Sequence, residues 1–249
     1  MNAIDLKNRV AVITGGSSRL SLAVAERFMA SGAAVSLWDF DAKALADAAA
    51  TFKATDANIC PVDIADPKSV KRAMDATVEH FGRIDILVNN IGLAGPDTVT
   101  WDYPIDHWQR VINVDLNGAF YCCRALVPIM LRHGYGRIAS IAFLPDDGLT
   151  LNMSAYSAAQ AGVIGLTESL CRELSPYNIT ANCITPAVLD DYIFKQITAH
   201  YSSDATNITR LSHFHQANQI ATLVAWICSE ECSFSLDASF DLMNSRLSL

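Results

Sequence analysis

The chain has 249 residues, 51% of them hydrophobic and 18% charged, and its formal net charge is -8 at pH 7. A chain of this length and hydrophobicity can bury one large core, which excludes a disordered protein and requires no second domain. The negative charge argues against nucleic acid or an anionic membrane surface as a partner.

The chain carries no evident targeting signal. Residues 1–9 include three charged side chains and lack the apolar core of a signal peptide. The longest stretch without a charge, residues 148–167, holds too many polar residues for a membrane span. Seven scattered cysteines without metal-ligand spacing indicate reduced, mostly buried thiols. We therefore expect a cytoplasmic protein with no membrane partner.

The first third of the chain alternates short β-branched runs with segments of helical period. These runs predict strands at residues 10–14, 34–38, 58–62 and 84–89, with helices at about 20–31, 42–52 and 67–81. The first helix is expected to end at Gly32, and the third to have Asp66 as N-cap and Pro67 in its first turn.

The rest of the chain continues the alternation with longer helices. It predicts strands at residues 137–141, 180–184 and 239–242, long helices at about 105–132 and 154–175, and a last helix from near Asn218. The second long helix is rich in alanine and glycine, which permits close packing, so we expect a homo-oligomer (a dimer or tetramer) through these two helices. Residues 189–211 are irregular and polar, as in a lid over a site.

Alternating strands and helices predict an α/β fold in which helices cover both faces of a parallel sheet. No linker or internal repeat interrupts the pattern, so residues 1–249 are expected to form a single domain. Binding sites in such doubly wound folds lie at the carboxyl ends of the strands. The functional residues should therefore follow the predicted strands.

A glycine-rich turn joins the first strand to the first helix, with the sequence Thr14-Gly15-Gly16-Ser17-Ser18-Arg19-Leu20-Ser21. A dinucleotide diphosphate binds backbone N–H groups at such a turn and helix N-terminus. Asp39 ends the second strand, where a carboxylate binds the adenosine ribose and repels a 2′-phosphate. The candidate cofactor-binding residues are Gly15, Ser17, Arg19, Leu20, Asp39, Asp63, Ile64 and Asn90.

Together with Ser140, Tyr156 and the run Asn182-Cys183-Ile184-Thr185-Pro186, this turn resembles the short-chain dehydrogenase/reductase family over almost the whole chain. The resemblance implies a seven-stranded Rossmann fold, NAD or NADP, and proton transfer by a tyrosine aided by a serine, a lysine and an asparagine. It makes Tyr156, Ser140, Gln160 and Asp115 the candidate catalytic residues. Asp39 favours NAD over NADP.

The chain departs from the family pattern at the positions that matter most. Arg19 and Ser21 replace two glycines of the turn, where side chains are expected to collide with the diphosphate or the strand behind it. Gln160 stands where the family has lysine, and Asp115 where it has asparagine. The segment from Ser140 to Tyr156 also looks about three residues longer than usual.

The missing lysine bears directly on the chemistry. An ordinary phenol, with a pKa near 10, is only about one part in a thousand ionised at pH 7, and lysine's charge normally lowers that pKa. Gln160 brings no charge, and a nearby Asp115 carboxylate would raise the pKa. We therefore expect a non-redox enzyme for a carbonyl or enolisable small molecule, with Tyr156 as proton donor, Ser140 as oxyanion partner, and no or only weak NAD binding.

Two alternatives stay open. The first is an NAD-dependent dehydrogenase or reductase of a hydroxy or keto substrate that uses unusual residues. The second is a non-catalytic subunit that pairs with an active homologue through the two long helices. Saturable NADH binding would favour the first, and occurrence only in a mixed complex would favour the second.

Several other residues carry less specific signals. Asp146 and Asp147 could serve as acids, bases or metal ligands, but fit a solvated turn better. His213 and His215 lack a third ligand, so no metal site is expected. Trp101, Tyr103 and Trp108 either line a pocket or simply pack together.

Overall fold

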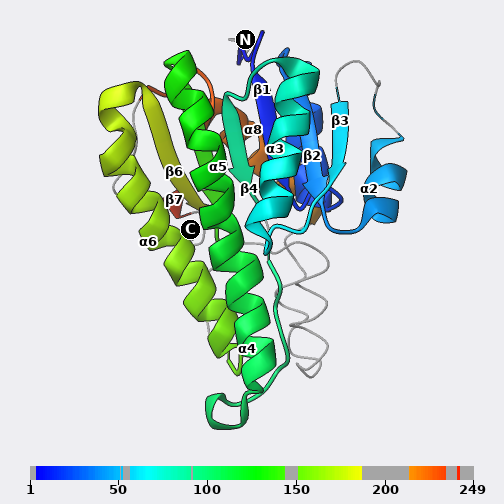
Figure 1. The fold of residues 1–249 in the computed structure, drawn as a ribbon, viewed down its shortest axis with the longest axis vertical. Coiled ribbons are helices and arrows are strands. Elements are labelled where there is room, and N and C mark those ends of the chain that lie inside the picture. Colours follow the sequence, from blue (N-terminus) through cyan, green and yellow to red (C-terminus); the bar gives the residue numbers. More distant parts are fainter. Residues whose placement is uncertain are drawn as a thin grey trace, which may run out of the picture.

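The computed structural model describes residues 4–50, 52, 57–90, 92–143, 151–186, 213–233 and 240–241. The predicted lid at residues 189–211, together with Asp146 and Asp147, lies outside the described residues. The described parts form one α/β layered fold (Figure 1).

A seven-stranded, entirely parallel sheet forms the centre of the molecule (Figure 1). Its order, β3-β2-β1-β4-β5-β6-β7, confirms the predicted Rossmann-type sheet. All seven strands lie within two residues of their predicted ends. Their bounds are β1 Val10–Thr14, β2 Ala34–Asp39, β3 Ala57–Pro61, β4 Ile86–Asn89, β5 Gly136–Ile141, β6 Ile179–Thr185 and β7 Phe240–Asp241.

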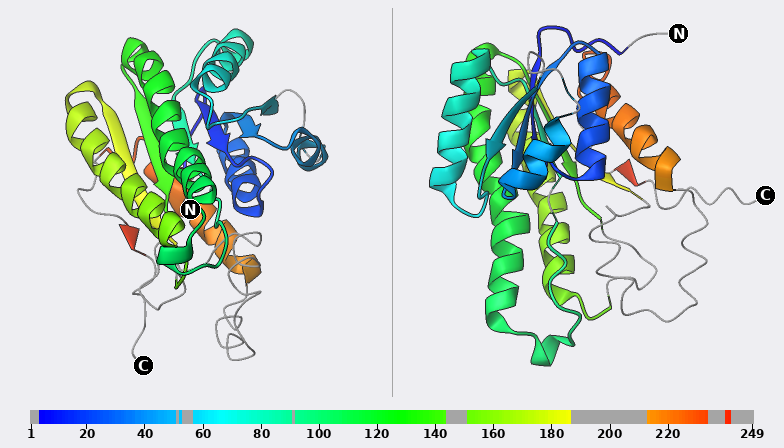
Figure 2. Two further views of the ribbon diagram at one scale, coloured as in Figure 1. Left: turned by 60° about the horizontal axis from the view of Figure 1, so that its bottom comes forward. Right: turned by 90° about the vertical axis from the view of Figure 1, so that its right-hand side faces the viewer.

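Helices cover both faces of the sheet, as the side view in Figure 2 shows. Helices α1 and α8 pack together on one face, and α3 and α5 pack together on the other. The bounds are α1 Arg19–Ala30, α2 Ala42–Ala49, α3 Pro67–Phe81, η1 Thr100–Asp102, α4 Ile105–Val111, α5 Gly118–His133, α6 Ser154–Leu174, η3 Ser175–Tyr177 and α8 His213–Ile227.

Local sequence signals explain most helix ends. Asp66 caps α3 by accepting from the backbone of Lys68 and Ser69, and Gly82 ends it in the left-handed region at φ +79°. Two boundaries were predicted wrongly. Helix α2 ends at Ala49 rather than near Phe52, and α8 begins at His213 rather than near Asn218. No glycine or proline in residues 213–217 marks a start, so the sequence left the second boundary unspecified.

The first of the two long helices is not a regular α-helix throughout. Between α4 and α5 lies one π-helical segment, η2 (Ile112–Asn117), which contains Asp115. Such π-bulges are frequently found at functional sites. The whole run Ile105–His133 is long and apolar enough to cross a membrane by composition alone. Here its inner side packs on α3, α6 and the sheet, as a layer of the fold.

Candidate functional site

The glycine-rich turn lies tightly against the second strand. Gly15 has φ +62°, a left-handed conformation that favours glycine, and the N–H of Gly16 donates to the carbonyl of Trp38 at 2.9 Å. A Cβ on Gly16 would lie only 2.9 Å from Cβ of Leu37. The two remaining glycines therefore keep the turn beside the end of β2.

Ser17 and Asp39 are joined across this turn, as the sequence predicted for a shared site. Oδ2 of Asp39 accepts from the backbone N–H of Ser17 at 2.9 Å and from its hydroxyl at 2.7 Å. The other oxygen, Oδ1, accepts from the N–H of Asp41 at 3.0 Å. These bonds fix the carboxylate at the carboxyl end of β2, where it remains partly exposed.

Ser21 does not obstruct the turn, contrary to our expectation of a collision. Its side chain is fully buried, and its hydroxyl donates to the carbonyl of Thr14 at 3.1 Å and accepts from Nδ2 of Asn90 at 2.8 Å. The same amide group donates to Oγ of Ser18 at 3.1 Å. The hydroxymethyl group therefore ties the turn to the end of β4 and points into the protein.

Arg19 and Leu20 differ in their surroundings. Leu20 is buried in the core between α1 and α8, so it supports the turn and contributes only its backbone to a site. Arg19 is the first residue of α1 and is partly exposed. A guanidinium there adds positive charge to the end of the helix that already attracts anions.

The remaining cofactor candidates follow β3 and β4. Oδ1 of Asp63 accepts from the N–H of Ala65 at 2.9 Å, and Ile64 packs against Gly118, where any side chain would collide with it. The N–H of Asn90 donates to Oγ1 of Thr14 at 3.0 Å. The strand order places these residues on either side of the glycine-rich turn at the same edge of the sheet.

Tyr156 lies in the first turn of α6 and is 1% exposed. It belongs to an apolar cluster with Tyr103, Val111, Phe143 and Met153. The cluster gathers the start of α6, the segment after β5 and the approach to α4. The ring of Tyr156 is therefore packed within this cluster.

Gln160, one helical turn further along α6, bridges two neighbouring segments. Its Oε1 accepts from the N–H of Phe143 at 3.0 Å, and its Nε2 lies 3.5 Å from Oδ2 of Asp115. Oδ1 of Asp115 in turn accepts from the N–H of Leu93 at 2.9 Å. The structure therefore brings Gln160 and Asp115 together and uses them to hold the segments after β4 and β5.

Asp115 lies in a setting that favours the neutral acid. Burial raises the pKa of its carboxyl group well above the usual value, and hydrogen bonds from Leu93 and Gln160 offset part of that shift. A neutral Asp115 does not oppose ionisation of Tyr156, as a carboxylate would. Asp115 also lines a small cavity beside Thr14 and Asn89, with room for about one water molecule.

The structure does not bring Ser140 to Tyr156. Ser140 is buried and accepts from Oγ1 of Thr167 at 3.0 Å. Thr167 lies three turns along α6 from Tyr156, a rise of roughly 16 Å. Phe143, three residues beyond Ser140, belongs instead to the buried cluster of Tyr156. If Phe143 takes the place of the family's serine, the segment up to Tyr156 is no longer three residues too long. That excess length was the signal in the sequence that we misread.

The other residues singled out from the sequence lie apart from this edge. All seven cysteines are free and buried, as predicted. His213 and His215 fall in the first turn of α8. Within the described residues no group of three potential metal ligands occurs. Trp101 is exposed, whereas Tyr103 is buried and meets Trp108 edge to face.

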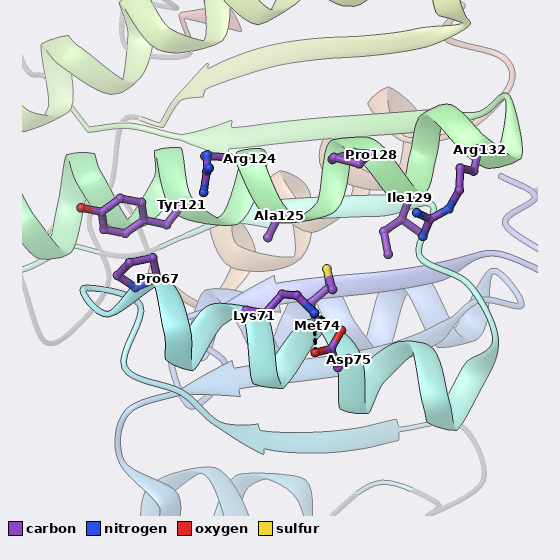
Figure 3. A pocket seen from close by; sticks show the side chains of 10 residues that line it. All are labelled: Pro67, Lys71, Met74, Asp75, Tyr121, Arg124, Ala125, Pro128, Ile129 and Arg132. Atoms are coloured by element: carbon purple, nitrogen blue, oxygen red, sulfur yellow. Dashed lines mark hydrogen bonds and ion pairs between the residues drawn. The ribbon is translucent and has the colours of Figure 1, made fainter.

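A wide groove of about 720 Å³ lies elsewhere, between α3 and α5 (Figure 3). Its floor includes Met74, Ala125 and Ile129, and Arg124 and Arg132 lie along its α5 side (Figure 3). None of the residues at the strand ends lines it. The groove is therefore separate from the candidate site.

Comparisons with known proteins agree with this geometry. A family model described as "Enoyl-(Acyl carrier protein) reductase" matches residues 17–236. The chain is 38% identical, over 96% of its length and 95% of the relative's, to 2-dehydro-3-deoxy-L-rhamnonate dehydrogenase (NAD(+)) from Sphingomonas sp. (strain SKA58). It is 34% identical to D-beta-hydroxybutyrate dehydrogenase from Rhizobium meliloti (strain 1021), covering 76% of the chain and 75% of that protein.

Among solved structures, NAD+-bound xylitol dehydrogenase is similar with a TM-score of 0.81 and 27% identity, covering 95% of this chain and 98% of that one. These relatives contradict our hypothesis of non-redox chemistry with no or only weak NAD binding, and that hypothesis was wrong. They favour the alternative of an NAD-dependent dehydrogenase or reductase. The physical reason lies in the turn. The collision that we expected from Ser21 does not exist, because its side chain is fully buried.

Proposed function

Because the chain belongs to the short-chain dehydrogenase/reductase family, we propose that it is an NAD-dependent oxidoreductase that interconverts a secondary hydroxyl group and a carbonyl group on a small hydroxy or keto acid. The observation that carries the proposal is the fixed carboxylate of Asp39, held by Ser17 at the same edge of the sheet where Tyr156 lies. The sugar-acid and hydroxy-acid names of two relatives support the substrate class.

The residues at this edge fit the adenosine and diphosphate parts of NAD. Asp39 would bind the adenosine ribose hydroxyls and disfavour a 2′-phosphate. Gly15, Ser17 and the guanidinium of Arg19 would hold the diphosphate, and Asp63 and Ile64 would border the adenine. When bound, NAD supplies or accepts the hydride. We infer a diverged family member, in which the positive charge of Arg19 attracts the diphosphate at a position where the family has glycine.

The chain's own contribution to the chemistry is proton transfer by Tyr156. Its hydroxyl would give a proton to the substrate oxygen in reduction and take one in oxidation. The network of Gln160, Asp115 and the N–H of Phe143 fixes the segments around it but contains no cation. Reduction needs a protonated phenol, so it is the direction that this site supports best at neutral pH.

The test is a binding and turnover experiment with the full chain. We expect NADH to bind with micromolar affinity in calorimetry, and 2-dehydro-3-deoxy-L-rhamnonate to be oxidised with NAD+. Tyr156→Phe should abolish turnover but leave NADH affinity unchanged, whereas Asp39→Ala should weaken NADH binding. Absence of both NADH binding and turnover in the unaltered protein would rule the proposal out.

We also propose that two copies pair through α5 and α6. The outer side of α6 exposes Ala158, Ala161 and Gly165, which would allow close approach of another helix. The neighbouring α5 exposes Phe120 and Leu131, large apolar side chains that water solvates poorly. A second copy would cover these side chains by self-complementary packing about a twofold axis.

A further inference from the structure

The hydroxyl group of Tyr103 is buried without a hydrogen-bond partner among the described residues. The side chain is only 9% exposed and lies between η1 and α4. Buried hydroxyls are normally hydrogen-bonded, so each exception requires an explanation. A ligand that reaches this hydroxyl would supply the missing partner.

The backbone at Gly95 makes room for this hydroxyl. Gly95 has φ +74°, and a Cβ there would collide with Oη of Tyr103 and come within 3.0 Å of Cγ2 of Val111. The ring is held from the other side by Trp108, with centroids 6.4 Å apart and an interplanar angle of 88°. The phenol is therefore fixed against the segment that follows β4, at the functional edge of the sheet.

Tyr103 and Tyr156 belong to the same buried cluster at this edge of the sheet. Among the described residues that directly follow β5, Ala142 and Phe143 carry no hydroxyl group, and Phe143 belongs to this cluster. Ser140 is engaged with Thr167 three helical turns away. Tyr103 is thus a second residue of this cluster, besides Tyr156, that carries a hydroxyl group.

We propose that Tyr103 is a second catalytic residue, whose hydroxyl donates a hydrogen bond to the same substrate oxygen that exchanges its proton with Tyr156. The inference rests on the proposed oxidoreductase function and adds a residue to it. A fixed donor aimed at this oxygen stabilises the negative charge that develops there during reduction. The resemblance assigns that task to a serine, but Ser140, the serine predicted for it, bonds Thr167 instead.

The surroundings of Tyr103 keep it a donor. Burial is the main cause that raises the pKa of its phenol, and Asp115 adds to the shift only when it is ionised. Tyr103 therefore keeps its proton over a wide pH range and polarises the substrate oxygen without releasing a proton. Proton transfer itself stays with Tyr156, so the two phenols have separate tasks.

The experiment compares Tyr103→Phe with a matched control, Tyr135→Phe. Tyr135 is also a buried tyrosine, but its hydroxyl donates to the carbonyl of Cys228 at 3.1 Å, away from the site. We expect Tyr103→Phe to lower kcat/KM by about 100-fold, as loss of one such donor does elsewhere, with no loss of melting temperature. Tyr135→Phe should melt earlier and keep its kcat/KM.

A second measurement does not depend on turnover. With NADH bound, 2-dehydro-3-deoxy-L-rhamnonate cannot be oxidised, so its affinity for this dead-end complex reports binding alone. We expect at least about tenfold weaker binding in Tyr103→Phe, and no change in Tyr135→Phe. If the unaltered protein is active and Tyr103→Phe matches it in both measurements, the role of Tyr103 is refuted while the proposed function stands. If the unaltered protein neither binds NADH nor turns over, both proposals fail.

Discussion

Nε2 of Gln160 lies 3.5 Å from Oδ2 of Asp115, and both side chains are almost completely buried. The contact joins the two positions at which the resemblance predicts a lysine and an asparagine, and this chain has neither residue there. It pairs an amide with a carboxyl group, so the site contains a hydrogen-bonded network in place of a buried cation. The stability and catalytic pH dependence of the protein should both reflect this exchange.

Asp115→Asn should change how stability depends on pH. The folded pKa of Asp115 lies above its unfolded value, so the folded state holds a proton that the unfolded state releases. The stabilisation from this proton is present below the unfolded pKa and is lost as pH rises through the folded pKa. As pH rises above the unfolded pKa of about 3.9, the stability of the variant relative to the unaltered protein should therefore increase by at most about 1.4 kcal/mol per pH unit, measured by thermal unfolding.

The control for this titration is Asp75→Asn on the surface of α3. Asp75 is exposed and pairs with Lys71 at 2.6 Å, so its removal should shift stability little over the same range. Parallel curves for Asp115→Asn and the unaltered protein would show that Asp115 is ionised in the folded state.

Gln160→Lys should restore the charge that the network lacks. An ammonium beside Tyr156 favours the phenolate, so oxidation with NAD+ at pH 7 should rise by roughly tenfold or more. Gln160→Met, which has similar size and no charge, should give no increase. Rates measured in both directions across pH would expose the effect, and an unchanged pH profile for Gln160→Lys would mean that Gln160 is too far from the phenol to matter.

Much of the fold follows from local sequence signals. Alternating strand and helix periods fix a parallel sheet, and capping residues such as Asp66 and Gly82 mark helix ends. The site was harder to infer, since the direction of a side chain on β5 depends on register. Only the packing against α6 shows that Phe143 joins the cluster of Tyr156, whereas Ser140 bonds Thr167. Similarly, the sequence could not reveal that Ser21 turns inward.

Ser140→Ala tests this reassignment. The hydroxyl of Ser140 bonds Thr167 inside the core, so its loss should cost about 1 kcal/mol of unfolding free energy and leave kcat/KM unchanged. Thr167→Val and the double variant complete a cycle that measures the coupling in chemical denaturation. A large fall in kcat/KM for Ser140→Ala without loss of stability would instead place Ser140 at the reacting oxygen.

Asp39→Ala should relax the choice of cofactor. The carboxylate is fixed by Ser17 and would hydrogen-bond the ribose, and charge-assisted bonds contribute about 1.5–3 kcal/mol. NADH affinity should fall by about tenfold to 100-fold, while NADPH affinity stays equal or improves because repulsion of its 2′-phosphate is removed. Ser17→Ala, which frees Asp39 without deleting it, should weaken NADH less. Equal loss for both nucleotides would contradict the ribose assignment.

Ala161→Glu should separate the proposed pair of subunits. Ala161 is exposed midway along α6, on the same outer side as Ala158 and Gly165, so a glutamate there would place a charge in the apolar contact. Burying two such carboxylates near a twofold axis costs both desolvation and mutual repulsion. Light scattering should show a shift to the monomer, whereas Ala46→Glu, the same change on an exposed side of α2, should leave the assembly intact. If Ala161→Glu leaves the assembly unchanged, the apolar outer faces of α5 and α6 are not what joins the subunits.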